Sequence, residues 1–219
     1  NIPFLSYLVL GGKCRHCKSK FSIRYFFIEL LTAFTFLGFY KIFGLTSVTA
    51  AYWVMVSGFI VATFVDFEHR IIPDEVSIGG MFVGLGLSFL IPELHGLVSP
   101  QWNLMIHLQA LGFSLIGVLV GGGSIYLMGL AGDLMFKKES MGGGDVKLMA
   151  MVGAFMGWKL ALLAFFLAPF FGAFYGIAEK IRTKDSTIAY GPFLVFGSLL
   201  SLFYGNQILH WILSGYGLR

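Results

Sequence analysis

Apolar residues are arranged along this chain in long blocks that are separated by short polar segments. The long blocks approach the roughly 20 residues that an α-helix needs to cross a bilayer. A shorter apolar run over 146–156 cannot span alone, and we expect a half-length helix that turns at Gly157 and Trp158 into the next one. The pattern predicts full-length helices over about 25–43, 48–65, 76–91, 104–130, 160–178 and 189–213.

The predicted fold is therefore all-α, a polytopic membrane bundle with about seven transmembrane helices. Hydrophobic residues make up 57% of the chain, charged residues 12%, and the mean hydropathy is +0.83, which excludes an ordinary water-soluble domain. We expect two parts, a basic cytoplasmic loop over 1–24 and a membrane domain over 25–219. Since the chain starts at Asn1 without an initiator methionine, we expect one further helix upstream.

The net charge of +4 predicts membrane orientation and not a nucleic-acid partner, because the basic residues are confined to a few short loops. Four segments, 1–24, 66–75, 131–147 and 179–187, fall on one side of the predicted topology. They hold twelve of the fifteen Lys and Arg residues, and only Lys41, Lys159 and Arg219 lie elsewhere. The positive-inside rule places these segments in the cytoplasm, which indicates the orientation of a multi-pass membrane protein.

Two aspartates at predicted helix ends, Asp66 and Asp145, share this cytoplasmic side. An ionisable group at the edge of a membrane helix is unfavourable unless it is paired or hydrated, and it therefore indicates function. Two neighbouring carboxyl groups cannot both ionise easily, so one keeps a proton and the pair offers a general base and a general acid. Structural alternatives are a helix N-cap for Asp145, a solvated helix-end carboxylate for Asp66, and a cap for Asp74 after Pro73.

Cys14 and Cys17 form a Cys-x-x-Cys pair in the basic segment, and they predict either a metal site or a redox pair. Zinc is the favoured metal ion, since two thiolate ligands at this spacing fit half of a tetrahedral site. The other half is not supplied by the neighbouring His16, which lies between the two cysteines. Glycine pairs such as Gly117 with Gly121 and Gly153 with Gly157 predict close packing of helix backbones in lipid.

Two motifs carry a resemblance to a known family. The stretch from Asp66 to Asp74 reads Asp-Phe-Glu-His-Arg-Ile-Ile-Pro-Asp, and the stretch from Gly142 to Leu148 reads Gly-Gly-Gly-Asp-Val-Lys-Leu. Together with residues 1–8, the Cys-x-x-Cys pair and residues 24–30, they resemble the type IV prepilin peptidases, polytopic aspartyl proteases also called leader peptidases. Nearly the whole chain is covered, and the motifs occur in the family's order.

The resemblance implies that Asp66 and Asp145 are the catalytic pair of a membrane aspartyl endopeptidase. It gives supporting roles to Asp74 and to Lys147, which would tune the pair, contact substrate or simply reach the interface as a lysine does. The glycines Gly142, Gly143 and Gly144 would let substrate approach Asp145 or would simply form a turn. A second upstream cysteine pair in relatives implies that the zinc site is incomplete in this chain.

The resemblance further implies the substrates: type IV prepilins or the pseudopilins of type II secretion, cut after a glycine at the end of a basic leader. Many members also methylate the new N-terminus with S-adenosylmethionine. The rival prediction is a proton- or cation-coupled transporter or channel, although the acids gather at one face and not at the midplane. The chain lacks the motifs of serine, zinc and nucleotide-dependent enzymes, and it gives no indication of oligomeric state.

Overall fold

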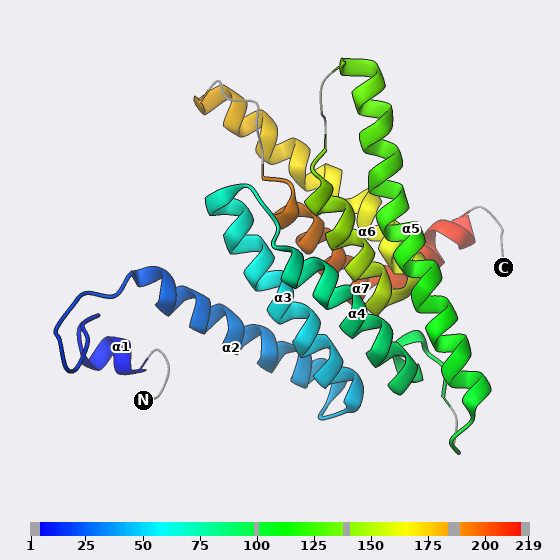
Figure 1. Cartoon of the computed structure of the whole chain (residues 1–219), viewed down its shortest axis with the longest axis horizontal. Helices are drawn as coiled ribbons and strands as arrows, with labels where there is room; N and C mark the ends of the chain where they lie inside the picture. The colour runs from blue at the N-terminus through cyan, green and yellow to red at the C-terminus, as the bar shows by residue number, and fades with distance from the viewer. Residues whose placement is uncertain (1–4, 99–100, 138–140, 184–188, 216–219) are drawn as a thin grey trace. The chain divides into compact units, whose positions relative to one another are not determined.

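The computed structural model describes residues 5–98, 101–137, 141–183 and 189–215, and this part of the chain is helical apart from short connections (Figure 1). The predicted all-α fold is confirmed, since the one strand-like pairing among these residues is an isolated bridge between Lys13 and Lys20. In chain order the elements are α1 (Leu5–Val9), α2 (Ile23–Phe43), α3 (Ser47–His69), α4 (Asp74–Leu90), the 3₁₀ helix η1 (Pro92–His95), α5 (Leu104–Phe136), α6 (Gly143–Thr183) and α7 (Gly191–Gly215).

The polytopic character is also confirmed, because five of the described helices, α2, α3, α5, α6 and α7, are long and apolar enough to cross a membrane. The number of about seven spanning helices is not confirmed. The runs predicted over 146–156 and 160–178 form one element, α6, with a break at Gly157. Helix α4 has 17 residues, slightly fewer than the roughly 20 that a bilayer needs.

All four segments predicted as cytoplasmic loops contain helix. The loop predicted over 66–75 is wrong at both ends, because α3 continues to His69 with the acidic cluster in its last turns and α4 begins at residue 74. Polar residues are tolerated there, where a helix leaves the apolar layer. The segment 1–24 contains the short helix α1, whose sequence is largely apolar.

The loops predicted over 131–147 and 179–187 are shorter than expected. Helix α5 continues to Phe136, and α6 begins at Gly143 and continues to Thr183. Residues 138–140 and 184–188 of these loops lie outside the described residues.

The chain forms two compact units, residues 1–60 and 61–219. In the first unit, α2 and the beginning of α3 form a hairpin, and Gly44 ends α2 with a left-handed φ of 69°. The rings of Phe36 and Trp53 stack with centroids 5.2 Å apart, and Trp53 Nε1 donates to the Phe36 carbonyl oxygen at 3.0 Å. The predicted division at residue 24 stays a prediction.

In the second unit, α6 packs against α4, α5 and α7 (Figure 1). Its contact with α5 is a backbone contact, because a Cβ atom added to Gly117 would overlap the backbone of Gly153, and one added to Gly153 would overlap that of Gly117. Gly121 lies equally close to the backbone of Met149. The prediction that these glycines serve close helix packing is confirmed.

Helix α6 breaks at Gly157, whose φ of 73° and ψ of 173° are not helical. Nearby, the carbonyl oxygen of Ala154 accepts hydrogen bonds from Ser88 Oγ at 2.9 Å and from Ser114 Oγ at 2.6 Å. The single Ser88 proton is thereby used, so His95 Nε2, 3.0 Å from Ser88 Oγ, is the donor to this oxygen. Burial lowers the pKa of His95 to about 4, which keeps the ring neutral.

The glycine contact between α5 and α6 gives a test of the fold. Gly117→Ala is expected to destabilise the protein by about 1–3 kcal/mol, because a methyl group would be forced against a backbone that cannot give way. Thermal unfolding in detergent measures this change. Gly112→Ala on the same helix is the matched control, since its Cβ would meet nothing within 4 Å. Equal melting temperatures for the two variants would contradict the contact.

Candidate functional site

Asp66 is a buried carboxyl group in the last turns of α3, with 5% of its surface exposed. The helix ends soon afterwards because Arg70 adopts a left-handed φ of 55°. The Arg70 N–H donates to the Asp66 carbonyl oxygen at 2.9 Å, which closes the last turn of the helix. Asp66 is therefore fixed at the point where α3 ends and the chain turns towards α4.

The Asp66 carboxyl group is held by the beginning of α7. Its Oδ2 atom accepts a hydrogen bond from the backbone N–H of Gly191 at 3.0 Å, and this contact is buried. Residue 191 has to be small, since a Cβ atom there would lie 2.8 Å from Asp66 Oδ2.

Asp145 lies in the first turn of α6, at the third helical position, and is partly buried. Its backbone N–H donates to the Gly142 carbonyl oxygen at 3.2 Å, and a Cβ atom on Gly142 would lie 3.5 Å from its Oδ2 atom. Asp145 is inside the helix and is thus not the N-cap of α6.

The three glycines before Asp145 differ in how closely they are packed. Among the described residues, the glycines with a left-handed φ lie elsewhere, so Gly142, Gly143 and Gly144 do not need glycine for backbone conformation. A Cβ atom on Gly143 would meet nothing within 4 Å, whereas one on Gly144 would lie 3.1 Å from Ile72 Cβ. Gly144 is therefore closely packed against Ile72, and Gly143 is not.

The structure places the surroundings of Asp66 and Asp145 against one side chain, Ile72. A Cβ atom on Gly191, whose N–H donates to Asp66, would lie 3.1 Å from Ile72 Cδ1, and one on Gly144, next to Asp145, would lie 3.1 Å from Ile72 Cβ. Tyr190 belongs to the same cluster. It directly precedes Gly191, and its pKa is raised to about 12, first by burial and then by the charge of Asp145. The phenol is therefore neutral and able to donate a hydrogen bond.

Two buried hydroxyl groups in this region have no hydrogen-bond partner in the described structure, Tyr190 OH and Thr63 Oγ1. Thr63 lies three residues before Asp66 on α3, which places both on one face of the helix. Other helical hydroxyl groups bond to the preceding turn, as Thr32 does to the Ile28 carbonyl oxygen at 2.7 Å. Buried polar groups are normally paired, so these two hydroxyl groups are exceptions among the described residues.

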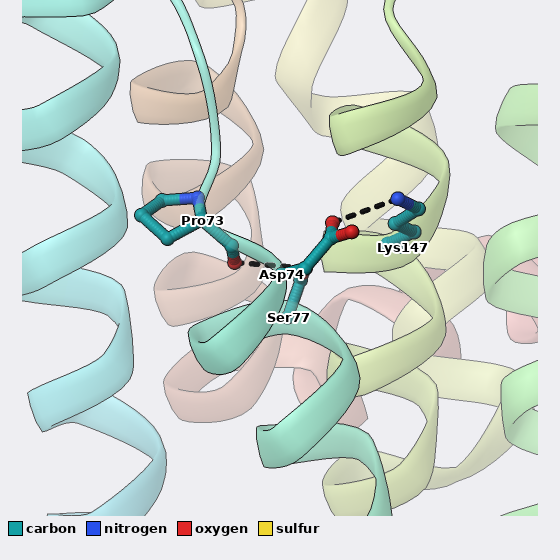
Figure 2. Close-up of polar contacts among 4 residues, drawn as sticks. All are labelled: Pro73, Asp74, Ser77 and Lys147. Atoms are coloured by element: carbon teal, nitrogen blue, oxygen red, sulfur yellow. Dashed lines mark hydrogen bonds and ion pairs between the residues drawn. The ribbon is translucent and has the colours of Figure 1, made fainter.

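Asp74 and Lys147 form an ion pair near the same helix ends. Lys147 Nζ lies 2.7 Å from Asp74 Oδ1, and the lysine and aspartate side chains are 42% and 57% exposed. Figure 2 shows Lys147 on α6 reaching towards the beginning of α4, where Ser77 Oγ donates to the Pro73 carbonyl oxygen at 3.1 Å. The cap predicted for Asp74 is wrong, because Pro73 is the N-cap of α4 and Asp74 is its first helical residue, with its carboxylate in contact with Lys147.

Cys14 and Cys17 lie in a tight turn of the N-terminal unit. The Cys14 N–H donates to the Ser19 carbonyl oxygen at 2.8 Å, and hydrogen bonds from Ser19 lower the pKa of Cys17 to about 7. A tetrahedral zinc site needs four ligands. The described residues contain no group of three or more His, Cys, Asp or Glu side chains able to hold a metal ion, so the predicted zinc site is not supported.

Sequence reasoning missed three members of the cluster, Gly191, Tyr190 and Ile72. Gly191 and Pro192 open α7, and this pair is a recognisable signal for a helix beginning. The signal does not reveal that the Gly191 N–H faces a carboxyl group 125 positions earlier in the chain. These contacts exist only in the folded bundle.

The packing of the glycine run can be tested without substrate. Gly144→Ala is expected to lower the free energy of unfolding by about 1–3 kcal/mol, because its methyl group would press on Ile72. Gly143→Ala is the matched control and should be neutral, or stabilising by up to about 1 kcal/mol through helix propensity. Thermal unfolding of both variants in detergent decides this, and a stable Gly144→Ala protein would disprove the contact.

Two protein-family models match the chain. The model of the type IV leader peptidase family covers residues 53–177, more than half of the chain, and includes both Asp66 and Asp145. The model of the bacterial peptidase A24 N-terminal domain covers residues 1–43, which include the two cysteines. The two matches follow one another along the chain as the resemblance in the sequence implies.

Curated proteins of the same kind are similar along nearly the whole chain. The prepilin leader peptidase/N-methyltransferase of Legionella pneumophila is 32% identical over 223 residues, 98% of this chain and 70% of that protein. The protein of the same name from Pseudomonas aeruginosa is 32% identical over 222 residues, 100% of this chain and 71% of that protein. No solved structure matches the chain. The family model and these relatives agree, and the chain belongs to the type IV leader peptidase family.

Proposed function

We propose that this membrane peptidase is an aspartic endopeptidase that removes the basic leader from prepilins or pseudopilins, with Asp66 and Asp145 as its catalytic pair. One observation carries the proposal. Two carboxyl-bearing residues on separate helices, Asp66 on α3 and Asp145 on α6, are joined through Ile72, which packs against Gly144 next to Asp145 and against Gly191, whose N–H donates to Asp66 Oδ2. The family membership supports peptide cleavage, and the curated relatives are named prepilin leader peptidases.

In the proposed reaction the pair shares one proton. The ionised carboxylate removes a proton from water, and the hydroxide so formed attacks the carbonyl carbon of the scissile peptide. The protonated carboxyl group gives its proton to the carbonyl oxygen, which yields a neutral tetrahedral diol. Return of a proton to the amide nitrogen and loss of a proton from one hydroxyl break the C–N bond, and the pair regains its original single proton.

We place the pair at the cytoplasmic face of the inner membrane. The distribution of Lys and Arg supports this orientation, since twelve of fifteen fall in segments on the side of Asp66 and Asp145. A substrate with a basic leader followed by an apolar helix would present its cleavage site at this interface. The hydroxyl groups of Tyr190 and Thr63 offer hydrogen bonds to the peptide being cut.

A second activity, N-methylation of the new N-terminus with S-adenosylmethionine, is part of the proposal because the relatives' names include N-methyltransferase. S-adenosylmethionine would supply the methyl group. Mass spectrometry of the mature product, with and without this compound, tests the activity. The transporter alternative is not supported, since the chain belongs to a peptidase family.

The catalytic pair is tested by isosteric substitution. Asp66→Asn and Asp145→Asn are each expected to abolish leader cleavage of a purified prepilin in detergent, because neither amide can act as acid or base. Asp74→Asn should keep measurable cleavage. Circular dichroism and thermal unfolding serve as folding controls. Full activity of Asp66→Asn or Asp145→Asn would contradict their assignment as the catalytic pair. An inactive Asp74→Asn enzyme would indicate Asp74 as the first catalytic aspartate.

The shared proton predicts a bell-shaped pH dependence of kcat/KM. Below the lower apparent pKa of the pair both carboxyl groups are protonated and no base remains, so the rate falls as the pH falls. Above the upper apparent pKa both are ionised and no acid remains, so the rate falls as the pH rises. Initial rates measured between about pH 4 and about pH 9 test this. A rate that stays constant across the range would contradict a one-proton pair.

A further inference from the structure

The connection between α3 and α4, residues 70–73, touches both halves of the proposed catalytic site. Its central side chain, Ile72, is buried, with 8% of its surface exposed. A Cβ atom on Gly144 would lie 3.1 Å from Ile72 Cβ, and one on Gly191 would lie 3.1 Å from Ile72 Cδ1. One apolar side chain therefore lies against two glycines from different helices.

Each of these glycines is linked directly to a catalytic aspartate. Gly144 precedes Asp145 in the chain, and the Gly191 N–H donates to Asp66 Oδ2 at 3.0 Å. The volume of the Ile72 side chain consequently limits how closely the beginnings of α6 and α7 approach each other. Because packed interiors transmit changes of even one methylene group, this volume also affects the separation of the two carboxyl groups.

Ile72 is itself fixed on its C-terminal side. Pro73 restricts the backbone, and its carbonyl oxygen accepts a hydrogen bond from Ser77 Oγ at 3.1 Å. The next residue, Asp74, pairs with Lys147 at 2.7 Å (Figure 2). Lys147 lies three residues after Gly144 in the first turns of α6. The ion pair therefore joins the same two segments that meet at Ile72.

We propose that Asp74 and Lys147 are positioning residues, whose ion pair holds Ile72 between Gly144 and Gly191 and so sets the separation of Asp66 and Asp145. The inference deepens the proposed function and rests on it. In this proposal Lys147 acts through Asp74, because its ammonium group contacts that carboxylate at 2.7 Å. Exposed ion pairs contribute little to global stability, so geometry is the effect to measure.

A double-mutant cycle tests the ion pair. Asp74→Asn and Lys147→Gln are each expected to lower kcat about three- to tenfold, with KM and the pH optimum unchanged, because misplacement by a fraction of an ångström slows the reaction. The double variant should be no slower than either single one, since both remove the same interaction. Lys147→Arg keeps the charge and should retain wild-type kcat. Glu75→Gln, in the same turn of α4 as Asp74, is the matched control.

The alternatives give different results. A rise in KM for Lys147→Gln with an unaffected Asp74→Asn would mean that the lysine binds substrate. A shifted pH optimum for Lys147→Gln alone would mean that its charge tunes the pair directly. Losses of kcat that multiply in the double variant would show two independent roles. Each of these outcomes overturns the proposal.

The role of Ile72 as a spacer between Gly144 and Gly191 is tested separately from the ion pair. Ile72→Val removes the Cδ1 atom that faces Gly191 and keeps the Cβ atom that faces Gly144, and it is expected to lower kcat about threefold. Ile71→Val is the control, because Ile71 is 59% exposed. Equal kcat values for the two variants would exclude Ile72 as the spacer.

Melting temperatures of the four proteins in the cycle keep the two proposals distinguishable, since they need no substrate. Non-additive shifts in melting temperature show that Asp74 and Lys147 are coupled even if the wild-type protein cleaves no leader. Absent cleavage by the wild type would reject the proposed function.

Discussion

The hydrogen bond from Gly191 to Asp66 connects the beginning of the last helix to the end of α3, and the arrangement of the site depends on it. A carboxyl group in a membrane-spanning helix is unfavourable unless other groups satisfy it. Here a backbone N–H at a helix beginning does so, and this requires a residue without a side chain at position 191. The chemistry of Asp66 thus determines where α7 can begin.

The apolar pattern predicts much of the fold, because the positions of helices depend mainly on local sequence. The turning point at Gly157 is an example: the run before it is too short to span, and the structure breaks there. The apolar pattern predicts that α3 ends at about residue 65, which is too early, since Asp66, Glu68 and His69 are polar and still helical. Local polarity indicates where a helix leaves the apolar layer, but it does not show where its hydrogen bonds end.

The site could be predicted only in part. Asp66 and Asp145 stand out because carboxyl groups are rare beside apolar blocks, and their motifs are specific. The partners that hold them, Gly191 and Ile72, carry no chemical signal of their own. A glycine and an isoleucine acquire a role through contacts across more than seventy residues of sequence, and such contacts become visible only in the folded chain.

Because α6 breaks at Gly157, a tilt at this residue would move the first half of the helix as a rigid arm. Asp145 lies twelve residues before the break, which at 1.5 Å per residue is an arm of about 18 Å. A tilt of about 5° at Gly157 would carry the carboxyl group by about 1.5 Å, more than the roughly 0.5 Å that a catalytic geometry tolerates. Ser88 and Ser114 both donate to the carbonyl oxygen of Ala154, and they fix the backbone of α6 three residues before this pivot.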